Sequence, residues 1–255
     1  MRVDLNCDLG ESFGRYTLGL DDEVIKYVSS ANVACGMHAS DPQVMAKTVR
    51  LAKAAGAAVG AHPGFADLQG FGRRNMDLSP MELHDLVLYQ LGALDGFCRA
   101  EGIKLSHVKP HGAMYNMAVK NAAMAGAICR AARDFDPALS ILAPDGSELQ
   151  RAAAECGLSF ICEVFADRAY QPDGTLVPRK MPGAMIDDEE EAISRVVRMV
   201  KTGLVRAISG EDIKVKAESI CVHGDSSKAL VFVQKIRVAL QDAGIEIKRG
   251  GREDD

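Results

Sequence analysis

Side chains that can transfer protons or bind metal ions recur where short apolar segments of this chain end. Five of the six histidines lie at such positions, together with several carboxylates and one lysine. These groups can act as general acids and bases, as ligands of a divalent metal ion, or as a cation beside an oxyanion. The candidate catalytic residues are Asp8, Glu11, Lys109, His111, Glu163, His223 and Asp225, and His38 and His62 are further candidates.

Two mechanisms fit these residue types. In the first, Asp8, His38 and His62 hold a divalent metal ion with a position open to water, and the ion lowers the pKa of that water and polarises a carbonyl. In the second, no metal takes part, a carboxylate activates water, and a histidine or Lys109 donates a proton. The residues lie far apart in the sequence, so their spacing leaves both mechanisms open.

Each candidate also has a purely structural interpretation. Taken singly, His38 or His62 fits a core histidine whose hydrogen bonds are satisfied, and Lys109 fits an internal ion pair. His84 lies inside a helical segment, and it and His107 are expected to be structural. A chemical role is favoured because several such residues occupy equivalent places in successive segments.

Two loop segments carry arginines that would suit an acidic ligand. Arg73 and Arg74 follow the third apolar segment, and Arg168 and Arg179 follow the sixth. A guanidinium binds a carboxylate or a phosphate through paired hydrogen bonds, although a solvated loop arginine is the commoner case. The glycines before Arg73 form no dinucleotide fingerprint, because the third glycine and the helix opening are missing, and no Walker-type loop occurs. The sequence therefore shows no site for ATP.

The elements that must position these residues alternate along the chain. Predicted strands are Arg2–Leu9, Ala31–His38, Ala57–His62, Leu105–His111, Leu139–Ala143, Ser159–Ala166 and Ser219–His223. Predicted helices are Asp41–Ala55, a segment beginning at Ser79, Val119–Asp134, Asp145–Cys156, Asp187–Thr202 and Ser226–Asp242. Asp41 is an expected N-cap, and Ser79 and Glu82 have the spacing of a capping box. Strands that alternate with helices indicate βαβ units and a parallel sheet.

The first predicted strand favours a barrel over an open, doubly wound sheet. Apolar residues at positions 3, 5 and 7 alternate with Asp4, Asn6 and Asp8, so the two sets lie on opposite faces. Buried polar side chains need partners, and a barrel lumen supplies them. The carboxyl ends of barrel strands converge on one mouth, which would gather the candidates. We therefore expect one seven-stranded barrel domain over residues 1–248 and a polar tail over residues 249–255.

Composition and charge restrict the classes of partner. The 255-residue chain has a net charge of −5, which argues against binding to nucleic acid. Its seven cysteines form no CxxC motif and lie mostly in apolar runs, which indicates reduced, buried thiols. No signal peptide or membrane-spanning stretch is recognisable, so we expect a cytoplasmic protein without a membrane partner. Nothing in the sequence excludes a homo-oligomer.

Seven segments, taken in order, match the pattern of one known family. The segments are Asp4–Glu11, Ala31–His38, Gly60–Phe65, Asp67–Arg74, Val108–Ala113, Glu163–Tyr170 and Cys221–Asp225. They resemble the LamB/YcsF family, which comprises the A subunits of prokaryotic 5-oxoprolinases, and the resemblance spans nearly the whole chain. Met37 and Ser40 depart from the family pattern, which usually has Phe and Gly there, but neither replaces a polar candidate.

The resemblance implies an ATP-dependent hydrolase that opens the lactam of 5-oxo-L-proline to L-glutamate while ATP is cleaved to ADP and phosphate. It implies partner subunits B and C, which would activate the substrate by phosphorylation. It also implies a seven-stranded (β/α) barrel similar to the glycoside hydrolase/deacetylase superfamily. The Asp-His-His metal sites of that superfamily would correspond here to Asp8, His38 and His62.

Ring opening would distribute roles among the candidates. Residues expected to bind the small-molecule substrate are Asn6, Arg73, Arg74, Arg168 and Arg179. Lys109, His111 or a metal ion would stabilise the oxyanion, and Asp8 or Glu163 would activate water. The alternatives are a stand-alone metal-dependent deacetylase of an N-acetylated sugar and a non-enzymatic protein that carries a small molecule or regulates an enzyme.

Overall fold

The computed structural model describes residues 1–186, 188–222 and 227–251. Seven parallel strands follow one another around a barrel in the order β1 (Arg2–Leu9), β2 (Ser30–Ala34), β3 (Ala58–His62), β4 (Leu105–Val108), β5 (Ser140–Ala143), β6 (Ser159–Phe165) and β9 (Ser219–Val222). Pairing of β1 with β9 closes the ring, with Asp4 opposite Ser219. The predicted seven-stranded (β/α) barrel is confirmed, and the open sheet is wrong.

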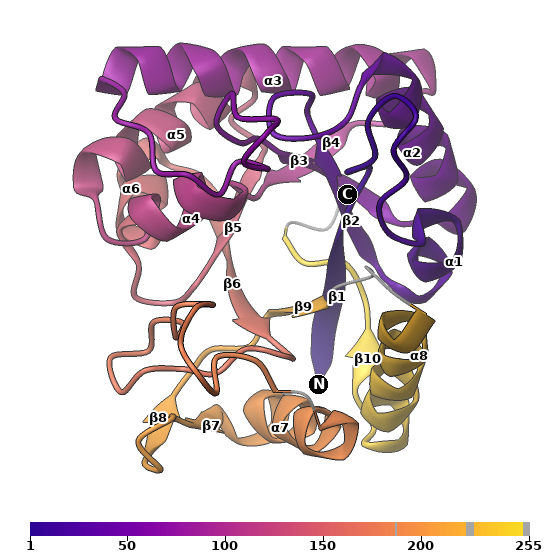
Figure 1. Ribbon diagram of the computed structural model, residues 1–255, viewed down its shortest axis with the longest axis vertical. Helices are drawn as coiled ribbons and strands as arrows, with labels where there is room; N and C mark the ends of the chain where they lie inside the picture. Colours follow the sequence, from indigo (N-terminus) through magenta and orange to yellow (C-terminus); the bar gives the residue numbers. More distant parts are fainter. Residues whose placement is uncertain (187, 223–226, 252–255) are drawn as a thin grey trace.

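Helices surround the strands, as Figure 1 shows, with α3 lying across the top of the view. They are α1 (Asp21–Val24), the 3₁₀ helix η1 (Ile25–Tyr27), α2 (Pro42–Ala55), α3 (Pro80–Ala100), α4 (Gly112–Ala118), α5 (Ala122–Phe135), α6 (Glu148–Cys156), α7 (Glu189–Thr202) and α8 (Ser227–Asp242). This outer layer covers the apolar side of the strands and leaves the lumen to polar residues.

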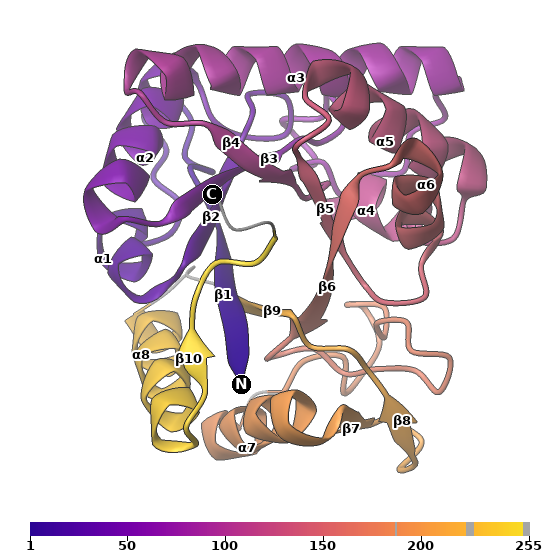
Figure 2. The same ribbon diagram turned by 180° about the vertical axis from the view of Figure 1, so that it is seen from behind.

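Three short strands were not expected from the sequence. β7 (Leu204–Arg206) and β8 (Asp212–Lys214) form an antiparallel hairpin, and β10 (Glu246–Ile247) pairs with the start of β1. Beyond β10 the chain passes the amino ends of the strands, where Gly250 lies against Ile161, and Figure 2 shows this segment from behind. Contacts with the barrel therefore continue past residue 248, where the polar tail was expected to begin.

Local capping signals place most helix starts. The Asp41 side chain accepts hydrogen bonds from two backbone N–H groups of α2, and Ser79 and Glu82 form the predicted capping box of α3. The helix expected over Val119–Asp134 is confirmed as α5, which begins at Ala122 because the Asn121 side chain caps its first turn. Helix α4, which ends at Ala118 before that span, was not expected.

Two strands end earlier than expected, and this places chemically important side chains in loops. β2 ends at Ala34 and Gly36 turns the chain with a φ of 90°, so His38 lies beyond the strand. β4 ends at Val108, just before Lys109 and a proline that has no N–H to donate. The N–H of Lys109 still donates to the backbone of β3 at 2.9 Å, so this loop stays beside the barrel wall.

The alternation predicted for β1 is confirmed. Asp4, Asn6 and Asp8 point into the lumen, where they form hydrogen bonds with side chains of other strands. Leu5 and Cys7 are fully buried in the hydrophobic core on the other face. The barrel thus separates an apolar shell under the helices from a polar interior that opens at the carboxyl ends of the strands.

The wall of the lumen leaves no room for a side chain at Gly60, where a Cβ would lie 2.0 Å from Nε2 of His107. Gly60→Ala is expected to lower the free energy of unfolding by about 1–3 kcal/mol, because overpacking displaces rigid neighbours. Gly92→Ala is the control. A Cβ at Gly92, within α3, meets nothing within 4 Å, so better helix propensity should add about 0.5–1 kcal/mol. Urea unfolding measures both changes, and equal midpoints would contradict this packing.

Candidate functional site

The amino end of the lumen is closed by hydrogen bonds to one buried carboxylate. Oδ1 of Asp4 accepts hydrogen bonds from the hydroxyl groups of Ser29 (2.6 Å) and Ser30 (2.7 Å), and Oδ2 accepts one from Ser219. Burial raises the pKa of Asp4 above its usual range. With every oxygen of the carboxyl engaged, Asp4 forms a floor below the site.

A layer of amides lies above this floor. Asn6 donates to Glu163 at 3.1 Å, and its Oδ1 accepts a hydrogen bond from Asn32 at 2.7 Å. Nε2 of His107 donates to Oδ1 of Asn32 at 2.6 Å, and burial lowers the pKa of His107 to about 3. His107 is therefore neutral and is held by a buried hydrogen bond, which fits the structural role expected for it. Asn6, which was expected to bind substrate, is fully buried and orients its neighbours.

Lys109 is the central charge of the lumen. Its Nζ lies 3.0 Å from Oδ1 of Asp8 and 2.8 Å from Oε1 of Glu163, and it donates to Sγ of Cys221 at 3.2 Å. Glu163 also accepts a hydrogen bond from the hydroxyl of Tyr115 at 2.7 Å. Burial disfavours the charged amine, but the facing negative groups outweigh it and hold the pKa of Lys109 well above its usual range. The ammonium is therefore charged and held in one place.

Three histidines lie at the mouth above this ammonium. Nδ1 of His62 lies 2.7 Å from the carbonyl oxygen of Lys109, and Nε2 of His111 lies 2.8 Å from that of Phe71. A carbonyl only accepts, so in the neutral rings Nε2 of His62 and Nδ1 of His111 carry lone pairs. These two nitrogens are 3.0 Å apart. Two acceptors at that distance repel each other unless a proton or a metal cation lies between them.

Glu11 completes a set of four metal-binding atoms. Its Oε1 lies 3.3 Å from Nε2 of His38, 3.4 Å from Nδ1 of His111 and 3.9 Å from Nε2 of His62. All four ligand atoms lie within 4.8 Å of one another. A tetrahedral zinc site with bonds of about 2.0–2.1 Å places its ligands roughly 3.4 Å apart, so the set suits a divalent transition metal. Backbone carbonyls that orient the rings are also typical of metal-binding histidines.

The predicted metal set combined Asp8 with His38 and His62. In the structure Oδ2 of Asp8 lies 3.4 Å from Nε2 of His62, while its Oδ1 accepts hydrogen bonds from two other side chains. Asp8 therefore borders the group of four ligand atoms, and Glu11 and His111 belong to that group. Both of these residues come from loops that follow strands.

The three histidines differ in their affinity for protons. Burial lowers the pKa of His38 and brings that of His111 to about 3. His62 is the exception, because Asp8 and Glu11 outweigh the effect of burial and raise its pKa. His38 and His111 stack face to face, with ring centroids 3.7 Å apart. With no metal bound, the proton between His62 and His111 therefore belongs to His62.

Glycines allow the backbone to close around the histidines. A Cβ at Gly64 would lie 2.5 Å from Nδ1 of His38, and one at Gly72 would lie 2.7 Å from Cβ of His38. Gly72 also has a φ of 62°, which is strained for any residue with a side chain. The buried Nδ1 of His38 has no hydrogen-bond partner within the described part of the chain, so Nε2, which faces Glu11, is its ligand atom.

The arginines expected to bind an acidic ligand lie in different environments. Arg74 forms an ion pair with Asp67, lowers the pKa of that carboxyl to about 2 and so holds its own loop. Arg73 is exposed, with its Cζ 4.9 Å from the centre of a phenylalanine ring at the mouth. Arg168 is buried and Arg179 is exposed, both in the segment that follows β6.

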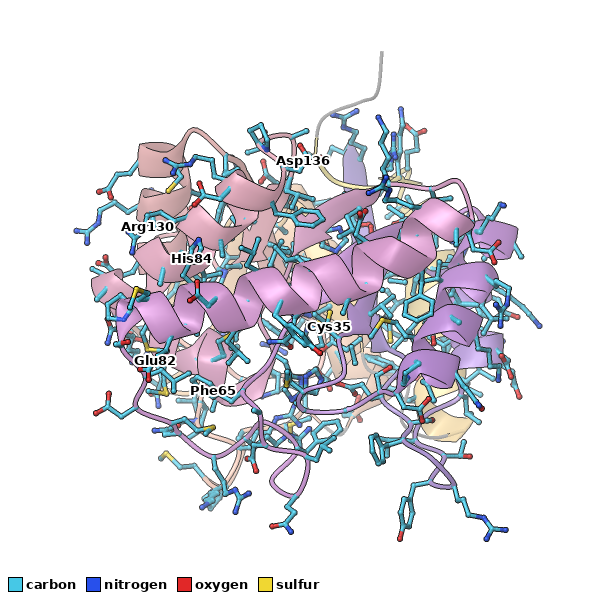
Figure 3. The ribbon with its side chains drawn as sticks, turned by 90° about the horizontal axis from the view of Figure 1, so that it is seen from above. Cys35, Phe65, Glu82, His84, Arg130 and Asp136 are labelled. Carbon is cyan, nitrogen blue, oxygen red and sulfur yellow. The ribbon has the colours of Figure 1, made fainter. Side chains whose placement is uncertain are left out.

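The remaining candidates lie away from the mouth or cannot be placed. His223 and Asp225 lie outside the described residues. His84 lies on α3, 3.2 Å from Asp134 of α5, and Figure 3 shows it at the outer side of the molecule.

All seven cysteines are free and six are buried, as predicted, and burial raises the pKa of Cys35 to about 12. No helix in residues 1–186, 188–222 or 227–251 is long and apolar enough to cross a membrane.

Comparison with known proteins assigns the family. The model of the LamB/YcsF family matches residues 3–253. The chain belongs to the LamB/YcsF family. Proteins named as the A subunit of 5-oxoprolinase, from Clostridium beijerinckii and Bacillus subtilis, are 61% and 54% identical to it, each over 96% of both chains. A lactam utilization protein from Thermus thermophilus is 48% identical, and its crystal structure matches with a TM-score of 0.93 over 97% of this chain and 99% of that one.

Membership confirms the resemblance, but sequence reasoning missed several residues of the site. Asn32 lies on the same face of its predicted strand as His38, and Cys221 alternates with apolar neighbours. The alternation of side chains along a strand could therefore have identified both residues as facing the lumen. Tyr115 reaches Glu163 from α4, a helix that was not expected, so no sequence pattern pointed to it.

The buried charges make the site sensitive to loss of its cation. Lys109→Met is expected to lower the free energy of unfolding by about 3–5 kcal/mol, because Glu163 and Asp8 would lose the group that compensates them. Lys47→Met is the control, since it removes an exposed pair with Asp22 and should cost less than about 1 kcal/mol. Urea unfolding at neutral pH compares the two variants. Similar losses would show that Lys109 is not the central charge.

Proposed function

We propose that the chain is a subunit of an ATP-dependent 5-oxoprolinase that hydrolyses the lactam of 5-oxo-L-proline to L-glutamate. The observation that carries this proposal is its identity of 61% and 54%, over nearly full length, to two proteins named as the A subunit of 5-oxoprolinase. The composition of the site is consistent with this activity, because the mouth of the barrel combines a buried ammonium, carboxylates and histidines. These groups suit hydrolysis of an amide.

Asp8 and Lys109 are the pair proposed to act on the lactam. Hydrogen bonds from Lys109 and Asn32 fix Oδ1 of Asp8, and Oδ2 faces the histidines at the mouth. As a carboxylate, Asp8 accepts a proton from the attacking water. The neighbouring ammonium of Lys109 offsets negative charge that develops on the lactam oxygen.

Glu163 is proposed to position this ammonium. Its Oε1 contacts Lys109 at 2.8 Å, its Oε2 accepts the hydroxyl of Tyr115, and the residue is 2% exposed. A carboxylate with both oxygens engaged below the mouth is poorly placed to reach water. Of the two bases considered from the sequence, Asp8 is therefore the better candidate.

A divalent metal ion is proposed for Glu11, His38, His62 and His111. With these four ligands, such an ion would need a fifth coordination position to polarise a carbonyl or to lower the pKa of coordinated water. The backbone carbonyls of Lys109 and Phe71 hold the protons of His62 and His111 on the nitrogens away from the site. These contacts keep the facing nitrogens available as ligands.

ATP use is assigned to a larger assembly. The lettered name of the relatives implies a complex of several subunits, and this chain has no Walker-type loop or dinucleotide fingerprint in its sequence. A five-membered lactam has little ring strain, so its hydrolysis is favoured when the substrate is activated first. We assign that activation to partner subunits B and C and the ring opening to this chain.

The deciding measurement is glutamate release from 5-oxo-L-proline, with and without ATP and subunits B and C. Glutamate is expected only when ATP and both partners accompany this chain. Turnover of an N-acetylated sugar by the isolated chain would instead support a metal-dependent deacetylase. Tight binding of a small molecule without turnover under any condition would support a carrier.

Asp8→Asn tests the proposed base within the complex. The variant keeps the shape of the side chain but cannot accept a proton, so kcat should fall by about 100-fold or more. Asp22→Asn, which removes an exposed carboxylate paired with Lys47, should leave kcat unchanged. Circular dichroism checks the fold of both. A wild-type rate in Asp8→Asn would exclude Asp8 as the base.

The metal proposal is tested on the isolated chain. Elemental analysis after purification without chelators is expected to find about one divalent transition-metal ion per chain. His111→Ala and Glu11→Ala should lose it, and His84→Ala, on the outer side of α3, should retain it. Cobalt added to the metal-free chain should produce visible absorption. Chains without metal that also give no cobalt absorption would reject the site.

A further inference from the structure

Arg168 is a buried guanidinium with few partners of its own. The residue is 6% exposed, its Nη2 donates to the carbonyl oxygen of Val177 at 2.7 Å, and its Nε has no hydrogen-bond partner in the described chain. The partner found for its Nη2 is thus a neutral carbonyl, although the charge of the neighbouring Asp167 also acts on it. Burying a charge is costly unless the charge is paired, so such an arginine indicates an anionic ligand.

Arg195 provides a contrast within the same region. Its guanidinium donates to the carbonyl oxygens of Ala166 (3.3 Å) and Arg168 (3.1 Å). Arg195 therefore holds the backbone on either side of residue 167 in place. The backbone that carries Arg168 is therefore fixed in place. The Nε of its guanidinium is still left without a hydrogen-bond partner in the described chain.

The segment that carries Arg168 lies beside the mouth of the barrel. It begins directly after β6, and the N–H of Ala166 donates to the carbonyl of Cys221 on β9 at 3.2 Å. Sγ of the same Cys221 accepts the hydrogen bond from Lys109. Figure 1 shows this segment between β6 and α7, at the end of the strand. Arg168 and Lys109 therefore serve the same end of the lumen.

A second cation strengthens the case for an anion. Burial, together with the charge of Arg179, lowers the pKa of Arg168, and the neighbouring Asp167 opposes this only in part. Two guanidinium groups close enough to disfavour each other's charge attract an oxyanion between or beside them. An arginine fork matches the geometry of a carboxylate or phosphate group.

We propose that Arg168 binds the anionic oxygen group of the ligand and so orients the lactam toward Lys109. In 5-oxo-L-proline this group is the carboxylate, and in a phosphorylated form it includes the phosphoryl group. The identity of the ligand rests on the proposed function. A neutral lactam lacks this contact, so Arg168 sets the preference for an acidic lactam over a neutral one.

Binding to the isolated chain tests the assignment with three probes: 5-oxo-L-proline, neutral 2-pyrrolidinone and inorganic phosphate. Arg168→Gln is expected to weaken binding of the acidic lactam or phosphate by about 10- to 100-fold and to leave 2-pyrrolidinone unchanged. Arg168→Lys should restore part of the loss. Arg198→Gln, which changes a surface arginine of α7 paired with Asp212, is the control and should bind like wild type. Calorimetry measures affinity, and circular dichroism checks the fold.

The outcomes separate this inference from the proposed function. Loss limited to 5-oxo-L-proline assigns the carboxylate to Arg168, and loss limited to phosphate assigns a phosphoryl group. If the wild-type complex releases no glutamate but phosphate stabilises wild type and not Arg168→Gln, the anion site stands and the proposed function fails. If the complex is active and Arg168→Gln keeps its KM for 5-oxo-L-proline and its affinity for phosphate, the inference is overturned. Failure of wild type to bind either anion also overturns it.

Discussion

The ammonium of Lys109 must be compensated inside a closed barrel, and much of the lumen is arranged to do so. Asp8 and Glu163 supply the opposing charge. Asn6 donates to the same Glu163 oxygen that contacts Lys109, and Tyr115 donates to the other. An unpaired charge in that position would cost several kcal/mol, so these side chains depend on one another. The polar residues of β1 are therefore required both by the fold and by the chemistry that its mouth can perform.

Lys109 also connects the charged side chains of the lumen with the histidines at the mouth. The side chain of Lys109 fixes Asp8, while its backbone carbonyl fixes the proton of His62 on Nδ1. These two contacts use different atoms, so changing the side chain leaves the carbonyl contact available. The loop that carries Lys109 begins where β4 ends, and its short path beside β3 holds both contacts in register. The position of this strand end therefore determines the geometry of the whole mouth.

Local patterns in the sequence predicted the fold better than they predicted the ligand set. Alternation along β1 and the capping signals at Asp41 and Ser79 depend on near neighbours in the chain, so the strands and most helix starts were predictable. Glu11 was recognised as a candidate, but its meeting with His111 depends on two loops that strand periodicity does not describe. Asn121 likewise sets the start of α5 a few residues later than expected, because its side chain accepts hydrogen bonds from the backbone N–H groups of the first turn.

The balance of charge at the mouth constrains how an acidic substrate can bind. Asp8 and Glu163 contact the ammonium of Lys109, and Glu11 adds a third carboxylate beside the histidines. Carboxylates in this number repel an anionic lactam unless further positive charge is present. A metal ion at the histidines would supply that charge on one side, and the guanidinium of Arg168 would supply it on the other. The two proposals therefore address the same electrostatic requirement: the metal ion would offset the carboxylates nearest the reacting carbonyl, and Arg168 would hold the acidic group away from them.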